Sequence, residues 1–272
     1  ALAGGAAGHV MNSFLVLAAA TDDAPLLAAN ADTLAVAVNA DSCPPRFQTM
    51  TRFVRTDAGV VVSRKNLHDL PETAFASGRQ HVKAREPYRL GYASFLETTL
   101  DAVEDGDMVR AAKTLAAWMD ETASRARPAT PEAVQGFYAF CRERLGREIY
   151  AGLENAPWLP GSLLDAHPGN VLRHPGTGDI RYIDLEWQLA CDIPLRLLID
   201  RGVNLVGQKL AAFAAYLDLP REGALPPAME AALARHPLFR RADAESLAAL
   251  TQWLFAAVTH GDLDHRRQHP PA

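Results

Sequence analysis

The stretch Leu163-Leu164-Asp165-Ala166-His167-Pro168-Gly169-Asn170-Val171-Leu172 decides the fold that this sequence predicts. It is a polar loop between two apolar steps, and Tyr182-Ile183-Asp184-Leu185-Glu186-Trp187 follows, with Asp184 fourteen residues after Asn170. Thr177-Gly178-Asp179 lies between the two segments and is a turn signal. We therefore expect a β-hairpin that brings Asp165, Asn170 and Asp184 together.

These three residue types fit the transfer of a phosphoryl group. That reaction needs positioning and charge neutralisation, mostly by Mg²⁺. Mg²⁺ prefers oxygen ligands and takes few from protein, and an Asn carbonyl and a carboxylate supply them. A second carboxylate orients the attacking hydroxyl and accepts its proton. The alternative is that Asp165 to Asn170 is only a polar turn and that Asp184 only caps a strand end. This alternative explains any one of the three residues well, but it explains all three at this spacing less well.

The pattern D-x-H-P-x-N-apolar, then a short hairpin, then I-D-x-E, resembles the signature of aminoglycoside phosphotransferases, choline kinases and homoserine kinases of that type. The resemblance implies that Asp165 is the catalytic base and that Asn170 and Asp184 hold Mg²⁺. It also implies ATP or GTP as phosphoryl donor, and a hydroxyl of a small molecule, sugar or glycan as acceptor. The family has His-Gly before the catalytic Asp, whereas this chain has Leu163-Leu164. A catalytically inactive kinase-like binding module therefore stays open.

The nucleotide side of the resemblance rests on Lys65, which ends the run VVVSRK from Val60. In kinase-like folds a lysine in this place pairs with nucleotide phosphates. Arg64 lies on the opposite face of the same strand, and a slip of one residue would exchange the two. A plain exposed lysine at a strand end is the other interpretation. Glu72 and Glu86 are the candidates for an acidic partner.

The segment Leu90 to Glu97 resembles the stretch that follows the hinge in many of these enzymes. By that resemblance the hinge residues Tyr88, Leu90 and Gly91 line the adenine pocket. Further on, the run from Glu186-Trp187 to Asp200-Arg201 resembles kinase-like domains of bacterial polysaccharide-assembly proteins. It implies a place in a larger protein of that kind, although Trp187 is equally explained as core.

The predicted fold class is α+β, and the resemblance implies a bilobal protein-kinase-like fold. Residues 1–91 form a strand-rich lobe, with strands expected at 12–20, 33–40, 46–55 and 60–65. Residues 92–272 form a helical lobe that contains the hairpin. Helical spacing predicts two helices separated by Gly106-Asp107, a third from Pro131 and more after Pro194. Phe137, Phe140, Cys141, Leu145, Ile149 and Leu153 are predicted to mark the buried face of the third helix.

The composition of the chain indicates its class of protein, its partners and its location. Its 272 residues are 49% hydrophobic and 22% charged, which is typical of a globular protein. A net charge of -5 disfavours nucleic acid as a partner.

The three cysteines are widely spaced and form no CxxC pair, so we expect neither disulfides nor structural zinc. Free cysteines fit a reducing compartment, and we therefore expect a cytoplasmic location. Apolar runs are too short for a membrane span, and residues 1–8 do not resemble a signal peptide. No initiator Met opens the chain, which is compatible with a piece of a longer protein.

Two further patterns compete with the main interpretation. A metal-dependent hydrolase would use Asp165, His167 and Asp184, but the Pro and Gly after His167 suit a turn better than a ligand. His260-Gly261-Asp262 contains the His-Gly pair that is missing before Asp165. However, the residue five positions after Asp262 is Arg267, where the pattern requires Asn. We therefore expect residues 260–272 to be a solvated tail.

Overall fold

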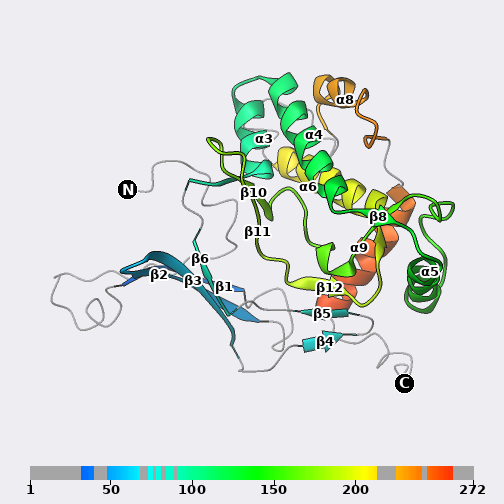
Figure 1. Ribbon diagram of the computed structural model, residues 1–272, viewed down its shortest axis with the longest axis horizontal. Helices are drawn as coiled ribbons and strands as arrows, with labels where there is room; N and C mark the ends of the chain where they lie inside the picture. Colours follow the sequence, from blue (N-terminus) through cyan, green and yellow to red (C-terminus); the bar gives the residue numbers. More distant parts are fainter. Residues whose placement is uncertain are drawn as a thin grey trace. The chain divides into compact units, whose positions relative to one another are not determined.

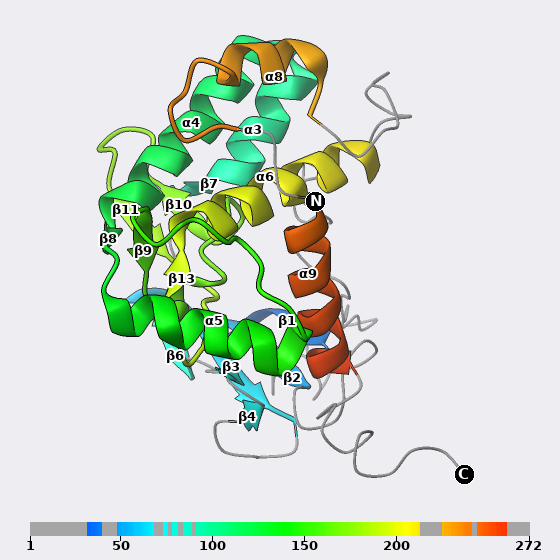
Figure 2. The same cartoon turned by 90° about the vertical axis from the view of Figure 1, so that its right-hand side faces the viewer.

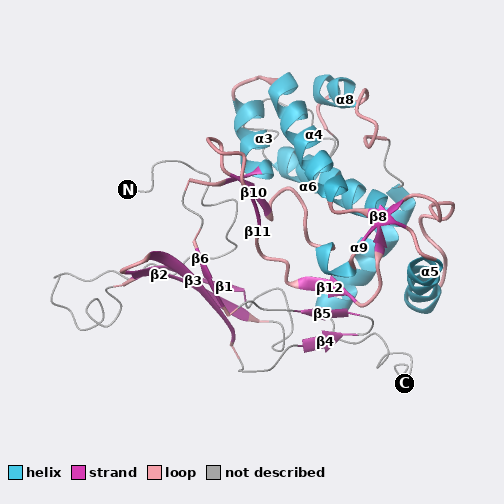
Figure 3. Ribbon diagram, viewed as in Figure 1, coloured by secondary structure: helices cyan, strands magenta, loops and turns pink. Residues whose placement is uncertain are grey.

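The computed structural model describes residues 32–39, 48–67, 73–75, 78–80, 84–88, 91–212, 225–240 and 244–259. The chain divides into two compact units, residues 1–90 with 255–272 and residues 91–254. The first unit is rich in strands, and the second contains most of the helical residues (Figure 3). The predicted α+β class with a strand-rich N-terminal region is confirmed. The pairings among β1, β2, β3 and β6, between β4 and β5, among β7, β10 and β11, and among β8, β9 and β13 are all antiparallel.

A four-stranded antiparallel sheet with strand order β1-β2-β3-β6 forms the first unit (Figure 1). Its strands are β1 (Thr33–Asn39), β2 (Thr49–Thr56), β3 (Gly59–Asn66) and β6 (Arg85–Pro87). A separate short hairpin pairs β4 (Thr73–Phe75) with β5 (Gly78–Gln80). The strands expected within 33–40, 46–55 and 60–65 are confirmed, whereas the one expected at 12–20 lies outside the described residues.

The turn between β2 and β3 explains their register. Gly59 has φ of 115°, a conformation that side chains other than glycine rarely adopt, and it pairs with Thr56 across the turn. From there the pairing runs without interruption to Thr49 opposite Asn66. Alternation along β3 then places Arg64 on the buried face and Lys65 on the exposed one.

Helices make up most of the second unit. They are α3 (Phe95–Glu104), α4 (Met108–Ser124), α5 (Pro131–Leu145), α6 (Leu195–Ala212), α8 (Pro227–Leu233) and α9 (Ala244–Thr259), the last of which belongs to this unit up to residue 254. Figures 1 and 2 both show α4 running beside α3, α6 and α8, and these pairs are in contact. None of the helices in the described ranges combines the length and the apolar character needed to cross a membrane.

Local signals set where the helices begin. Ser94 and Glu97 form a capping box at the start of α3. Asp107 caps α4 by accepting from the Arg110 amide. Thr130 caps α5, whose first residue is Pro131. The helix starts predicted from Gly106-Asp107 and Pro131 are therefore confirmed.

The third helix is shorter than predicted. It ends at Leu145 because Gly146 adopts the left-handed conformation, with φ of 71°, which terminates a helix. Ile149 and Leu153 keep the helical spacing but lie beyond this end, so their assignment to the helix was wrong. Ile149 is nevertheless buried.

Short strands complete the second unit in two three-stranded sheets, with orders β11-β10-β7 and β13-β9-β8. Their bounds are β7 (Ala93–Ser94), β8 (Arg127–Pro128), β9 (Pro157–Leu159), β10 (Val171–Arg173), β11 (Ile180–Tyr182) and β13 (Ile193–Pro194). A 3₁₀ turn, η2 (Gly161–Leu163), precedes the polar loop, and β12 (Trp187–Leu189) follows the hairpin. The core of the unit includes the fully buried Trp118, Phe137 and Trp158, and the last two rings meet edge to face at 5.6 Å.

Candidate functional site

The β10–β11 hairpin brings the two motif segments together, as predicted. Val171 pairs with Tyr182 and Arg173 pairs with Ile180. Beyond the last pair, the Ile183 amide donates to the Asn170 carbonyl at 2.9 Å. The first metal-ligand candidate therefore lies directly before β10, and the second lies two residues after β11.

Asn170 joins the three candidate residues through its side-chain amide. Nδ2 donates one hydrogen bond to the backbone oxygen of Asp165 at 3.0 Å and another to that of Asp184 at 3.1 Å. Both amide hydrogens are thereby used within the site. The amide oxygen Oδ1 accepts no hydrogen bond from the described residues, so it is able to accept an outside ligand.

Asp165 is a buried carboxylate beside a positive and a negative charge. Its side chain is 8% exposed, and Oδ1 accepts from Nη2 of Arg201 at 2.7 Å. Burial raises the pKa of Asp165 to about 6, an effect that Arg201 opposes and the nearby charge of Asp184 reinforces. The two carboxylates thus lie close enough to repel each other, an arrangement that a divalent cation would relieve.

Three helices fix the loop that carries Asp165. The indole Nε1 of Trp118 in α4 donates to the Ala166 carbonyl at 3.0 Å. The Leu96 amide in α3 donates to the Pro168 carbonyl at 3.0 Å. Arg201 on α6 binds the carboxylate itself. The loop is therefore held at several points along its length.

His167 serves the turn, as its neighbours indicate. Its Nδ1 accepts from the Gly169 amide at 3.1 Å. Burial lowers the pKa of His167 to about 3, helped by the charges of Arg201 and Lys209, so the imidazole is neutral at physiological pH. Within the described ranges no group of three or more His, Cys, Asp or Glu side chains is placed to hold a metal ion.

Asp184 stands in a backbone conformation that few residues adopt. Its φ is 50°, and among the described non-glycine residues only Tyr150 shares a positive value. Such strain costs of order 1–3 kcal/mol and clusters at functional sites. The strand β11 ends at Tyr182, so Asp184 lies in the segment that follows the strand.

The first unit contains Lys65, the proposed partner of the nucleotide phosphates, and its neighbour Arg64. Lys65 is exposed at the end of β3, opposite Met50 of β2. Arg64 forms an ion pair with Glu86, and the two side chains are 9% and 8% exposed. Glu86 therefore pairs with the arginine rather than with Lys65, and Glu72 lies outside the described residues.

The three expected adenine-pocket residues have different settings. Tyr88 is 47% exposed, and its ring meets that of Phe53 edge to face at 5.6 Å. Leu90 lies outside the described residues. Gly91 belongs to the second unit and has φ of 79°. The segment after Gly91 joins the hairpin, because β7 pairs with β10 and the Tyr92 hydroxyl donates to Asp179.

Sequence reasoning missed Arg201 as a partner of Asp165. The signal for it was a charged pair, Asp200-Arg201, inside the apolar run Leu197 to Val203. Charged groups in such a run are seldom buried unless they are paired. It also missed Trp118, whose hydrogen bond to the loop spans 48 positions.

Comparisons with protein-family models, with curated proteins and with solved structures find no match to this chain. The candidate site therefore rests on the residues and contacts described above.

Proposed function

We propose that this chain is an ATP- or GTP-dependent and Mg²⁺-dependent phosphotransferase of the kinase-like class that acts on a hydroxyl of a small molecule, sugar or glycan. The observation that carries the proposal is the pair of hydrogen bonds from Asn170 to the backbones of Asp165 and Asp184. They hold the backbones of Asp165 and Asp184 at the Asn170 side chain, and these three residues carry the two carboxylates and the amide oxygen that the proposed phosphoryl transfer would use. A bilobal kinase-like arrangement of the two units is part of this proposal.

Each residue has a distinct role in the proposed reaction. The Asn170 oxygen and the Asp184 carboxylate would hold Mg²⁺, which supplies charge neutralisation for the phosphates. Asp165 orients the acceptor hydroxyl and takes its proton. Arg201 favours the charged form of Asp165, which is the form able to accept a proton. Lys65 is the proposed cation for the nucleotide phosphates, and Tyr88, Leu90 and Gly91 are the proposed lining of the adenine pocket.

The direct test is transfer of labelled phosphate from γ-³²P-ATP with Mg²⁺ to a panel of sugars, amino alcohols and glycans. We expect a labelled product from the wild type and a loss of roughly 10²–10⁴-fold in Asp165→Asn. Asp101→Asn is the matched control, because Asp101 is exposed on α3. Undiminished transfer by Asp165→Asn, with thermal unfolding like that of the wild type, would show that Asp165 is not the base.

An inactive kinase-like binding module is the second candidate, favoured by Leu163-Leu164 in place of His-Gly and by the exposed position of Lys65. Such a module binds nucleotide without turning it over. Ligand binding must raise the apparent stability, by about 2.7 kcal/mol at a hundredfold excess over Kd. A thermal shift with ATP and Mg²⁺ but no labelled product would support this candidate. If ATP and Mg²⁺ cause no thermal shift and no labelled product forms, both candidates are contradicted.

A further inference from the structure

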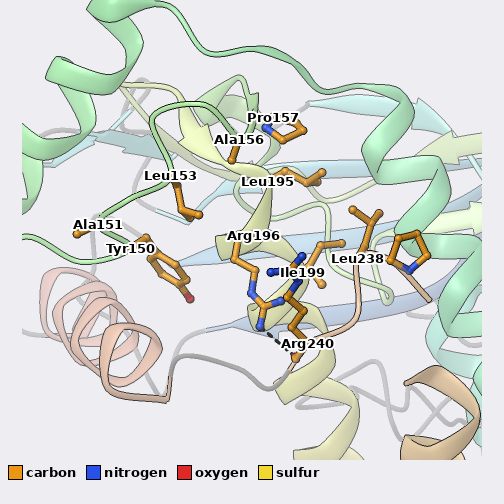
Figure 4. Close-up of a pocket in the computed structure, with 11 residues that line it drawn as sticks. Tyr150, Ala151, Leu153, Ala156, Pro157, Leu195, Arg196, Ile199, Leu238 and Arg240 are labelled. Carbon is orange, nitrogen blue, oxygen red and sulfur yellow. Dashed lines mark hydrogen bonds between the residues drawn. The ribbon is translucent and has the colours of Figure 1, made fainter. Parts of the chain in front are cut away.

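A pocket of about 440 Å³ lies in the second unit and is not lined by Asp165, Asn170 or Asp184. Three segments form it: residues 150–157, the first turns of α6, and residues 237–240 (Figure 4). Its volume falls within the range of small-molecule sites, about 300–1,000 Å³. Nothing in the proposed phosphotransferase function uses it.

Most of the pocket wall is apolar. Aliphatic side chains from all three segments line it, namely Leu153, Pro157, Leu195, Ile199 and Leu238. In Figure 4, Leu153 and Leu238 lie on opposite sides of Arg196. A ligand with an apolar body would lose water from both surfaces on entering, which favours binding.

Two arginines give the pocket its charge. Arg196 donates from Nη2 to the Arg240 carbonyl at 3.0 Å and forms an ion pair with Asp200 Oδ1 at 2.8 Å. Asp200 is 1% exposed, so this carboxylate balances Arg196 inside the protein. Arg240 is exposed and has no acidic partner in the described part of the chain. One positive charge is therefore left at the pocket rim.

Tyr150 makes one wall of the pocket rigid. Its backbone has φ of 53°, and its hydroxyl donates to Asp200 Oδ2 at 3.2 Å. Its carbonyl accepts from the Tyr138 hydroxyl at 3.1 Å, and its amide donates to Ser246 Oγ at 3.3 Å. A wall fixed before the ligand arrives reduces the entropy lost on binding.

We propose that this pocket binds a small amphipathic anion. Its apolar body would contact Leu153, Leu195 and Leu238, and its single carboxylate or phosphate group would pair with Arg240. The positive charge of Arg240 disfavours cationic ligands, and the apolar wall disfavours a bare inorganic anion. The proposal does not depend on the phosphotransferase activity.

The test is a ligand-observed NMR titration with three probes that share one tail: octanoate, octyl phosphate and octanol. We expect at least one anion to bind roughly tenfold more tightly than octanol, because a charge-assisted hydrogen bond is stronger than a neutral one. Arg240→Gln should remove that tenfold advantage and leave octanol binding unchanged. The tighter of the two anions identifies the head group.

Two variants keep the test decisive. Arg235→Gln removes an exposed charge outside this pocket and should leave all three affinities unchanged. Ala156→Phe fills the pocket and should abolish binding of all probes, with circular dichroism confirming that the chain is folded. The proposal is overturned if octanol binds as tightly as the anions, if Arg240→Gln has no effect, or if folded Ala156→Phe still binds octanoate.

Discussion

Asn170 is the residue on which the geometry of the candidate site depends. Its side-chain amide donates hydrogen bonds to the backbone carbonyls of both Asp165 and Asp184. In Asn170→Asp the two donated hydrogen bonds disappear, and a carboxylate oxygen faces two carbonyl oxygens. We expect the free energy of unfolding to fall by about 2–3 kcal/mol, measured by urea denaturation. Asn155→Asp, at an exposed turn residue, should change it by less than about 0.5 kcal/mol. Equal stability of the two variants would contradict the role given to Asn170.

The burial of Asp165 and its contact with Arg201 predict how the Asp165 carboxyl titrates. In the metal-free protein the Asp165 carboxyl should titrate with a pKa of about 6, followed by ¹³C NMR of labelled aspartate and assigned with Asp165→Asn. Arg201→Gln should raise this pKa further, because the guanidinium favours the charged form. A lower pKa in that variant would contradict the ion pair.

The same shift has a consequence for stability. The pKa of Asp165 is higher in the folded chain than in the unfolded chain, where it is near 3.9. Between about pH 4 and about pH 6 the folded chain therefore holds a proton that the unfolded chain has released. Asp165 stabilises the fold at the acid end of this window, and its contribution is lost as the pH rises.

At the scale of elements, helix α6 links several features. Arg201 binds Asp165, the neighbouring Asp200 binds Arg196 and Tyr150, and Gly202 lies against the Trp118 ring. A Cβ on Gly202 would overlap that ring and lie 2.9 Å from Pro168 Cδ. The loop before Asn170 therefore needs a glycine at this place in the helix.

Gly202→Ala tests this packing. We expect a loss of about 1–3 kcal/mol in the free energy of unfolding, since overpacking forces neighbouring atoms to shift. Gly136→Ala in α5 is the matched control, because a Cβ there would meet Cys191 at an ordinary 3.8 Å. That variant should be neutral or stabilised by up to about 1 kcal/mol. Stabilisation in both variants would refute the close contact with Trp118.

Local signals account for what the sequence predicted about the elements. The β10–β11 hairpin follows from the turn residues Thr177-Gly178-Asp179, which act within a few positions. The end of α5 was predicted too late because apolar spacing continues past Gly146, although the backbone there is left-handed. The contact between Asp165 and Arg201 joins residues 36 positions apart, and no local pattern encodes such a pairing.

At the scale of the whole molecule, burial protects the thiols of the second unit. It raises the pKa of Cys141 to about 12 and that of Cys191 to about 11. In a Cys43→Ser variant at pH 8 we expect Ellman's reagent to label the native protein at least roughly a hundredfold more slowly than the urea-unfolded chain, because little thiolate is present. Rapid labelling of the native variant would contradict this burial.

In the proposed function, Asn170 and Asp184 hold one divalent ion beside Asp165. The most direct measurement is the anomalous scattering of Mn²⁺, used in place of Mg²⁺, in crystals grown with a non-hydrolysable ATP analogue. We predict a peak between the Asn170 side-chain oxygen and the Asp184 carboxylate, at roughly 2.0–2.3 Å from each. A manganese peak elsewhere in the chain, with these two oxygens unliganded, would contradict the account.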